Sequence, residues 1–123
     1  MILGYGIDIA EIERLKHVHQ RFGMNFLRKI LAENELVAMP ENIFPWLAGR
    51  FAAKEAASKA LGYGFSRGIS PLDFMIFQND SGKPELKLMK KAGEYARNLG
   101  IRHTLLSISH ERNYAIAGVI LED

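Results

Sequence analysis

Residues 46–62 read WLAGRFAAKEAASKALG, and this stretch decides the fold. Gly49 is the only glycine before Gly62, and no proline interrupts the run. Pro45 suits the first position of a helix, and Gly62 suits the left-handed residue that follows a helix end. The pattern therefore predicts a helix over residues 46–61, around which the other elements must pack.

The charges of this predicted helix fall into groups. At 100° per residue, Glu55 and Lys59 lie one turn apart on one face. They form either an exposed pair worth a few tenths of a kcal/mol or a metal carboxylate with a nearby lysine. Arg50 and Lys54, on the adjacent side, add the charge that a pyrophosphate-bearing substrate requires. Small residues flank the charged face and permit close approach: Ala48, Ala52 and Ala56.

A second carboxylate ends the first predicted strand. Residues 2–9 alternate, with large apolar side chains at odd positions and Gly4, Gly6 and Asp8 at even ones. Asp8 is either a turn former or cap, or a metal ligand. Mg²⁺ typically takes one or two protein carboxylates and completes its shell with water and substrate phosphates. Asp8 and Glu55 together would satisfy that requirement.

The remaining pattern mixes helices and strands without strict alternation. We expect a helix from Glu11 to Phe22 ended by Gly23, and a short helix capped by Asn25 that continues through Leu31. The other expected elements are a loop over 41–45, strands over 73–78 and 85–88, a helix over 89–99, and hairpin strands over 104–109 and 114–121. This predicts an α+β protein, a single compact domain over residues 1–123 with a mostly antiparallel sheet packed with helices.

Composition narrows the function classes. The chain of 123 residues is 48% hydrophobic and carries a net charge of only +2, so its whole surface is not built for a polyanion. It has no cysteine, which excludes disulfides and thiolate chemistry. The longest uncharged stretch, Asn113 to Leu121, has nine residues, about half of what a membrane span needs. The acidic beginning of the chain is unlike a secretory signal. We therefore expect a cytoplasmic protein with no membrane association.

A basic patch interrupts this balance. Between positions 14 and 29 there are five basic residues and no acidic one: Arg14, Lys16, Arg21, Arg28 and Lys29. Phe22, Met24 and Phe26 could supply apolar anchors for a partner. Such a patch is a solvated face, a nucleic-acid contact or a site for an acidic protein. No RNA-binding or zinc-finger signature occurs, so we expect no nucleic acid partner for the main function.

Two stretches resemble signatures of the holo-acyl-carrier-protein synthases, the short class of 4′-phosphopantetheinyl transferases. The first is Gly6-Ile7-Asp8-Ile9 with Ile12 and Arg14, and the second is Leu47 to Ala56 with Lys59 and Ala60-Leu61-Gly62. Lesser blocks follow in the family's order: Phe26 to Leu31 with Glu35, Gly82-Lys83-Pro84, and Ser107 to His110. The loop before Leu47 is short and lacks the lysines of some relatives, and the segment 87–103 is longer than in many.

The resemblance implies a 4′-phosphopantetheinyl transferase fold and reaction. Such enzymes move the 4′-phosphopantetheine group of coenzyme A to a serine of apo acyl carrier protein, release adenosine 3′,5′-bisphosphate, serve fatty acid biosynthesis and require Mg²⁺. By position, Asp8 and Glu55 would hold the metal and Lys59 would neutralise the diphosphate. Arg50 and His110 would contact phosphate or nucleotide. The serine proton would go to Glu55 or to a metal-bound water, with His110 a less favoured base.

The resemblance also implies a homotrimer with its sites between adjacent subunits. The small-residue strand over 114–119 could then pack against a second copy. We expect the acidic carrier to dock on the basic patch, through Arg14, Arg21, Arg28, Phe22 and Phe26. The competing class is a non-enzymatic module that binds an acidic protein or RNA through residues 14–29. It would leave Asp8, Glu55 and Lys59 without a role.

Overall fold

The computed structural model describes residues 1–123 as strands and helices of an α+β fold, as the sequence predicted. The strands are β1 (Ile2–Glu11), β2 (Phe74–Gln78), β3 (Pro84–Leu88), β4 (His103–His110) and β5 (Tyr114–Glu122). The helices are α1 (Ile12–Phe22), α2 (Met24–Ile30), α3 (Glu33–Val37), α4 (Ile43–Leu61) and α5 (Lys90–Leu99), with a 3₁₀ turn at Pro71–Asp73. No helix combines the length and apolarity needed to cross a bilayer.

All strand pairs are antiparallel. β1, β5 and β4 form a three-stranded sheet in that order, and β2 pairs with β3 in a separate two-stranded sheet. The Thr104 hydroxyl on β4 donates a hydrogen bond to the Leu86 carbonyl on β3, at 2.8 Å. This hydrogen bond links the neighbouring edges of the two sheets.

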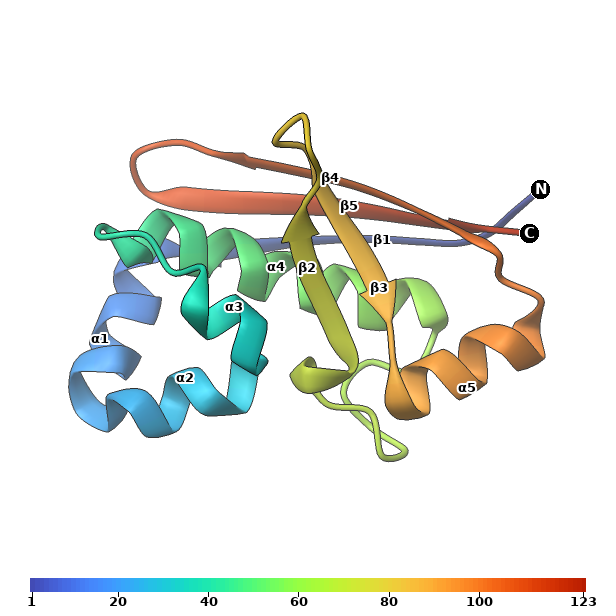
Figure 1. Cartoon of the computed structure of the whole chain (residues 1–123), viewed down its shortest axis with the longest axis horizontal. Helices are drawn as coiled ribbons and strands as arrows, with labels where there is room; N and C mark the ends of the chain where they lie inside the picture. Colours follow the sequence, from blue (N-terminus) through green and yellow to red (C-terminus); the bar gives the residue numbers. More distant parts are fainter.

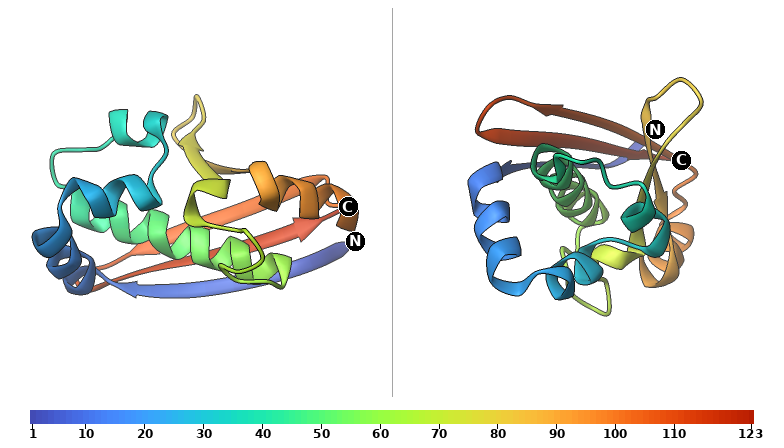
Figure 2. Two further views of the ribbon diagram at one scale, coloured as in Figure 1. Left: turned by 90° about the horizontal axis from the view of Figure 1, so that it is seen from below. Right: turned by 60° about the vertical axis from the view of Figure 1, so that its left-hand side comes forward.

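Helix α4 is the centre of the molecule. It runs along one face of the three-stranded sheet, with α1, α2 and α3 at one end and the β2–β3 pair and α5 farther along (Figures 1 and 2). Twelve of its residues are buried, including Arg50, Lys54 and Ser58. Other elements therefore cover most of α4, and Glu55 and Lys59 are among its less buried residues.

Strand β1 lies against α4 with its small residues inward. A Cβ atom added at Gly6 would lie 1.9 Å from the Ala56 carbonyl oxygen, and one at Gly4 would lie 2.1 Å from that of Ala60. Only glycine permits this approach of strand to helix backbone. Asp8 follows on the same face of the strand, so these contacts carry its carboxylate towards α4.

The large apolar residues of β1 consequently point away from the core. Figure 2 shows α4 on one face of the three-stranded sheet and no element of this chain on the other. Exposed apolar side chains cover that outer face: Leu3, Tyr5, Ile7, Ile9, Leu105, Tyr114 and Ile116. The alanines of β5 do not belong to it, contrary to expectation. Ala115 and Ala117 are buried in the core, because they alternate with the outward Tyr114 and Ile116.

Several predicted boundaries were wrong. Helix α4 begins at Ile43, so the loop expected over 41–45 is shorter and Pro45 is the third helical residue. Its missing N–H costs nothing there, because the first turn has no internal acceptors for it. Helix α2 begins at Met24 after Gly23, so Asn25 is not its cap. The five-residue α3 was not predicted, since it is too short to show a helical period.

Candidate active site

Asp8, Glu55 and Lys59 meet where β1 crosses the second half of α4. The Lys59 ammonium donates a hydrogen bond to Oδ1 of Asp8 at 2.8 Å and another to the Ile7 carbonyl at 3.2 Å. The side chain of Asp8 is only 11% exposed, whereas that of Lys59 is 53% exposed. Lys59 therefore pairs with the strand and not with Glu55 one turn away, which excludes the simple exposed helix pair.

The negative charges of Asp8 and Glu55 interact. Burial, followed by the negative charge of Asp8, raises the pKa of Glu55, and the positive charges of Lys59 and Arg14 oppose that rise. The hydrogen bond to Asp8 raises the pKa of Lys59. Two half-buried carboxylates that repel each other, with an ammonium already held on one of them, are a site that favours a cation.

The donor set suits one kind of metal. The chain forms no cluster of three or more His, Asp or Glu side chains, so it offers no complete protein cage for zinc or calcium. Two carboxylates on rigid elements match Mg²⁺, which keeps waters and takes substrate phosphates into its shell. The residues present therefore fit Mg²⁺ held jointly by the protein and a phosphorylated substrate.

Lys54 does not join this site. Its side chain is fully buried and its ammonium donates hydrogen bonds to Oε1 of Glu35, at 2.7 Å, and to the Ile30 carbonyl. The expectation that Lys54 faces a pyrophosphate was wrong, because this side of α4 packs against the α2–α3 segment and β2. Glu35 was missed as a partner, since no local pattern links positions 19 residues apart.

Arg50 lies one turn before Lys54 and opens onto a cavity. The cavity has a volume of about 290 Å³ and is lined by Asn34, Glu35, Ala38, Trp46, Arg50, Ile76, Phe77 and Gln78. The Arg50 guanidinium lies 4.5 Å from the centre of the Trp46 ring, and its buried Nε has no hydrogen-bond partner. Burial lowers the pKa of Arg50, and the charge of Glu35 opposes this. A buried cation with an unused donor indicates a place for an anion.

His110 ends β4 opposite Ala115, whose side chain faces the core, so the His110 side chain is on the α4 side of the sheet. This end of β4 also borders a hollow of about 280 Å³, which is lined further by Ile9, Tyr114 and Ile116. A second hollow, of about 260 Å³, is lined by Ile7, Asp8, Ile9, Lys59 and Ile116. The two hollows share Ile9 and Ile116, so they form one continuous surface. Arg50 lines neither hollow, and a single chain does not bring all the predicted residues together.

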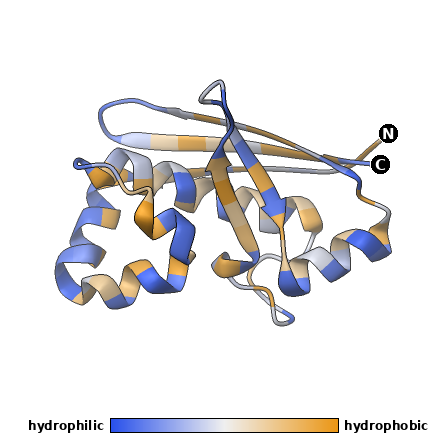
Figure 3. Cartoon of the chain, viewed as in Figure 1, coloured by the Kyte–Doolittle hydropathy of each residue, from blue (hydrophilic) through white to orange (hydrophobic).

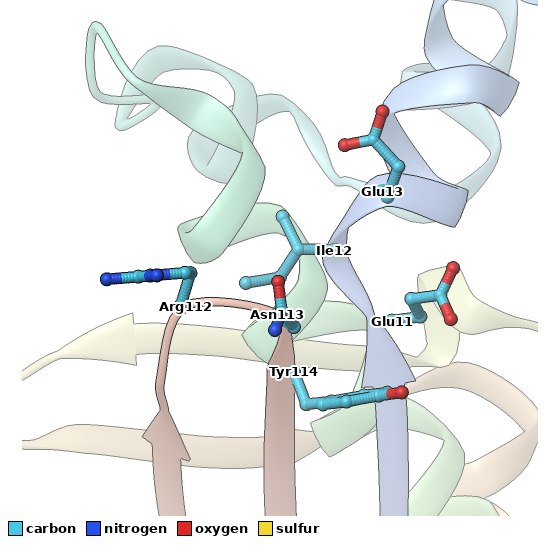
Figure 4. A pocket seen from close by; sticks show the side chains of 6 residues that line it. All are labelled: Glu11, Ile12, Glu13, Arg112, Asn113 and Tyr114. Atoms are coloured by element: carbon cyan, nitrogen blue, oxygen red, sulfur yellow. The ribbon is translucent and has the colours of Figure 1, made fainter.

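A further cavity marks the junction of β1, α1 and the β4–β5 turn (Figure 4). It measures about 270 Å³ and is lined by Glu11, Ile12, Glu13, Arg112, Asn113 and Tyr114. The Ile12 amide donates a hydrogen bond to the Asn113 carbonyl at 2.9 Å, which fixes the start of α1 to the turn. None of the predicted catalytic, metal-binding or cofactor-binding residues lines this cavity.

The basic patch lies on α1 and α2. Most positions of α1 are hydrophilic (Figure 3). Arg14, Arg21 and Arg28 are exposed. Phe22 is 54% exposed, whereas Phe26 is half-buried and packs against the core. Of the two aromatic residues predicted as anchors, Phe22 is thus the accessible one.

Similarity to known proteins identifies the chain as a phosphopantetheine-transferring enzyme. The model of the 4′-phosphopantetheinyl transferase superfamily matches residues 4–118. The chain is 47% identical over 122 residues to the holo-[acyl-carrier-protein] synthase of Desulfovibrio desulfuricans, covering 99% of this chain and 98% of that protein. The chain belongs to the holo-[acyl-carrier-protein] synthase family within this superfamily.

Solved structures of holo-[acyl-carrier-protein] synthases have the same fold as this chain. The holo-[acyl-carrier-protein] synthase of Neisseria meningitidis superposes with a TM-score of 0.93 at 34% identity, covering 100% of both chains. The Helicobacter pylori enzyme, solved in complex with coenzyme A, superposes with a TM-score of 0.87 at 36% identity, covering 96% of this chain and 99% of that one. The similarity therefore extends across the whole described structure and is not confined to one motif.

Proposed function

We propose that residues 1–123 act as one catalytic domain that transfers 4′-phosphopantetheine from coenzyme A to a serine of apo acyl carrier protein, with Asp8, Glu55 and Lys59 at the reacting centre. Family membership supports this reaction. The observation that carries the residue assignment is the pairing of Lys59 with Asp8 beside Glu55, on two elements locked together by glycines. Fatty acid biosynthesis in the cytoplasm is the setting that such a reaction requires.

Asp8 and Glu55 are the residues that would hold Mg²⁺. When bound, the metal would neutralise the coenzyme A diphosphate and hold it for an in-line displacement. Lys59 has a half-exposed ammonium and would meet the same phosphate oxygens from the solvent side. Because phosphoryl transfer depends mainly on position and charge, the rigid β1–α4 contact is as important as the charges themselves.

The displacement has a simple balance of bonds. The serine oxygen bonds to the β-phosphorus, and the bond from that phosphorus to the bridging oxygen breaks to release adenosine 3′,5′-bisphosphate. Glu55 is this chain's acceptor for the serine proton. A water on the metal, if bound, is the alternative acceptor for this proton.

Two cations would contact the nucleotide half of coenzyme A. Arg50 has a buried guanidinium with an unused Nε in a cavity lined partly by Trp46. His110 is exposed at the end of β4, opposite the inward-facing Ala115. The two residues line separate cavities in one chain, and a homotrimer with its sites between subunits would allow one site to use both.

The apolar outer face of the sheet supports the expected homotrimer. Ile7 and Ile9 are 48% and 61% exposed, and they border the hollow that contains Asp8 and Lys59. A second copy seated there would bury this apolar surface and close the reacting centre from one side. We expect Ile9→Glu to convert the oligomer to monomer in multi-angle light scattering, with loss of transfer activity. A variant that stays trimeric and active would contradict this interface.

The carrier protein would dock on the basic patch, with Arg14, Arg21 and Arg28 facing its acidic surface and Phe22 as the accessible apolar anchor. Phe26 would support Phe22 from the half-buried side. Arg14 also opposes the rise in the pKa of Glu55, so the patch begins next to the reacting centre. A serine delivered by the carrier would therefore arrive at that centre.

The decisive experiment is intact-mass measurement of apo acyl carrier protein after incubation with this protein, coenzyme A and Mg²⁺. We expect the carrier to gain one phosphopantetheine group and adenosine 3′,5′-bisphosphate to appear. Omission of Mg²⁺ with a chelator present should abolish the gain. An unmodified carrier under the complete conditions would contradict the proposed reaction.

A further inference from the structure

The ammonium of Lys59 occupies the place where a cation is needed. It touches Oδ1 of Asp8 at 2.8 Å, and Asp8 is one of the two carboxylates assigned to Mg²⁺. The same ammonium also donates to the Ile7 carbonyl at 3.2 Å. Lys59 thus bridges α4 to two acceptors on β1 and supplies the only positive charge bonded to Asp8.

The same lysine is needed elsewhere during the reaction. In the proposed function, on which this inference rests, Lys59 neutralises the coenzyme A diphosphate. An ammonium has three donors, and two of them are already directed at Asp8 and the Ile7 carbonyl. The side chain is 53% exposed, so it is free to swing from the strand towards solvent. One donor remains free in this arrangement, so a change of partner is needed only if Lys59 is to direct more than one donor at the phosphates.

We propose that Lys59 is a substitute cation, which holds Asp8 against α4 until a divalent metal replaces it and thereby releases it to the substrate phosphates. Without any cation, two neighbouring half-buried carboxylates would repel each other. Lys59 prevents this in the metal-free protein. Metal entry then breaks one ion pair and makes a phosphate-binding donor available, which couples metal binding to coenzyme A binding.

The first test is metal affinity without coenzyme A, measured as free Mn²⁺ by electron paramagnetic resonance. Lys59→Met should bind Mn²⁺ roughly five- to tenfold more tightly than the unchanged protein, because it removes a competing charged hydrogen bond. Lys59→Arg keeps a cation that reaches Asp8 and should return the affinity towards the original value. Since Lys59 is half exposed, we expect both variants to fold, and circular dichroism checks this.

A matched control separates direct competition from general electrostatics. Arg14→Met removes another positive charge that acts on Glu55 but forms no ion pair with Asp8. It should raise Mn²⁺ affinity much less than Lys59→Met. Equal gains in the two variants, or no gain in Lys59→Met, would overturn the inference while leaving the metal site intact. Absence of Mn²⁺ binding in every variant would overturn the metal assignment and the inference together.

The second test is coenzyme A affinity by calorimetry. Lys59→Met should weaken coenzyme A binding several-fold in the presence of Mg²⁺ and change it little in a chelator, because only the metal frees Lys59 for the phosphates. An equal loss under both conditions would mean that Lys59 meets coenzyme A without prior metal binding, which would overturn the exchange. Either result is independent of whether the carrier protein is modified.

Discussion

The Nζ atom of Lys54 lies 2.7 Å from Oε1 of Glu35, and both side chains are almost fully buried. Glu35 also accepts hydrogen bonds from the Ala32 amide, at 2.9 Å, and the Ile76 amide, at 3.4 Å. The pair thereby joins α4 to the α2–α3 segment and to β2. It fixes one side of α4, while Glu55 on another side faces β1.

Breaking this pair should destabilise the protein strongly. Lys54→Met leaves the carboxylate of Glu35 buried without a cation, so we expect the free energy of unfolding to fall by about 3–5 kcal/mol. Lys59→Met is the matched control, with the same substitution on the same helix at a half-exposed pair, and should change it by less than about 1 kcal/mol. Urea unfolding of both variants measures the difference.

The double variant makes the test specific. Lys54→Met combined with Glu35→Gln removes both charges, so its loss of stability should be clearly smaller than the sum of the two single losses. Additive losses would show that packing, and not the ion pair, dominates at this position.

The sequence alone predicted the elements whose signals are local. Gly62 marks the end of α4, the alanines of α4 indicate the close approach of another backbone, and Asp8 lies beside Lys59 and Glu55 as the motifs indicated. Each of these expectations depends on spacing within one element plus one contact between two elements.

The failures all involve long-range packing. Helical spacing places Lys54 next to Arg50 but does not say which element covers that face, and Glu35 lies in a helix too short to be predicted. The exposure of Ile7 and Ile9 could not be predicted either. Alternation indicates the two faces of a strand but does not indicate which face meets the core. Only the glycine contacts decide that β1 is turned with its small side inward.

A substitution at the β1–α4 contact tests whether the glycines set the orientation of β1. Gly6→Ala places a Cβ atom 1.9 Å from the Ala56 carbonyl oxygen, so the strand must move away from the helix. We expect a loss of thermal stability of at least several degrees and a loss of metal affinity, because Asp8 moves with the strand. Gly118→Ala on the neighbouring strand is the control, since its Cβ would meet nothing within 4 Å. Similar effects of both variants would contradict this explanation.

Removal of either carboxylate should abolish transfer without loss of the fold. Asp8→Ala and Glu55→Ala each leave one protein ligand for the metal, so we expect the rate with saturating Mg²⁺ to fall by roughly two orders of magnitude or more. Mass measurement of the carrier over time gives the rate, and circular dichroism checks the fold. Activity within a few-fold of the original would contradict the metal role of that residue.

Glu55 should also make the metal-free protein less stable at higher pH. Its pKa is raised in the folded protein, so the folded state binds more protons than the unfolded state at pH values just above the ordinary value of 4.5. The free energy of unfolding must then fall as the pH rises through that interval. Glu55→Gln, which is neutral throughout, should lack this component of the decline in urea unfolding at a series of pH values. An unchanged pH profile would contradict the raised pKa.

The basic patch should act on the carrier and not on coenzyme A. Arg14→Glu with Arg21→Glu puts like charges in front of an acidic partner, so the KM for the carrier should rise at least tenfold while that for coenzyme A stays nearly unchanged. The control reverses the same number of charges at exposed positions outside the patch, as Arg97→Glu with Arg102→Glu, and should leave the carrier KM within about twofold of the original.

Salt should reproduce the effect of the patch variant. At about 1 M ionic strength the Debye length is about 3 Å, so steering of the carrier by Arg14 and Arg21 is lost and association slows. The double variant has already lost this steering and should respond much less to salt. If the variant weakened coenzyme A and carrier equally, or kept the salt dependence of the original protein, the patch would belong to the nucleotide site or to the fold and not to carrier docking.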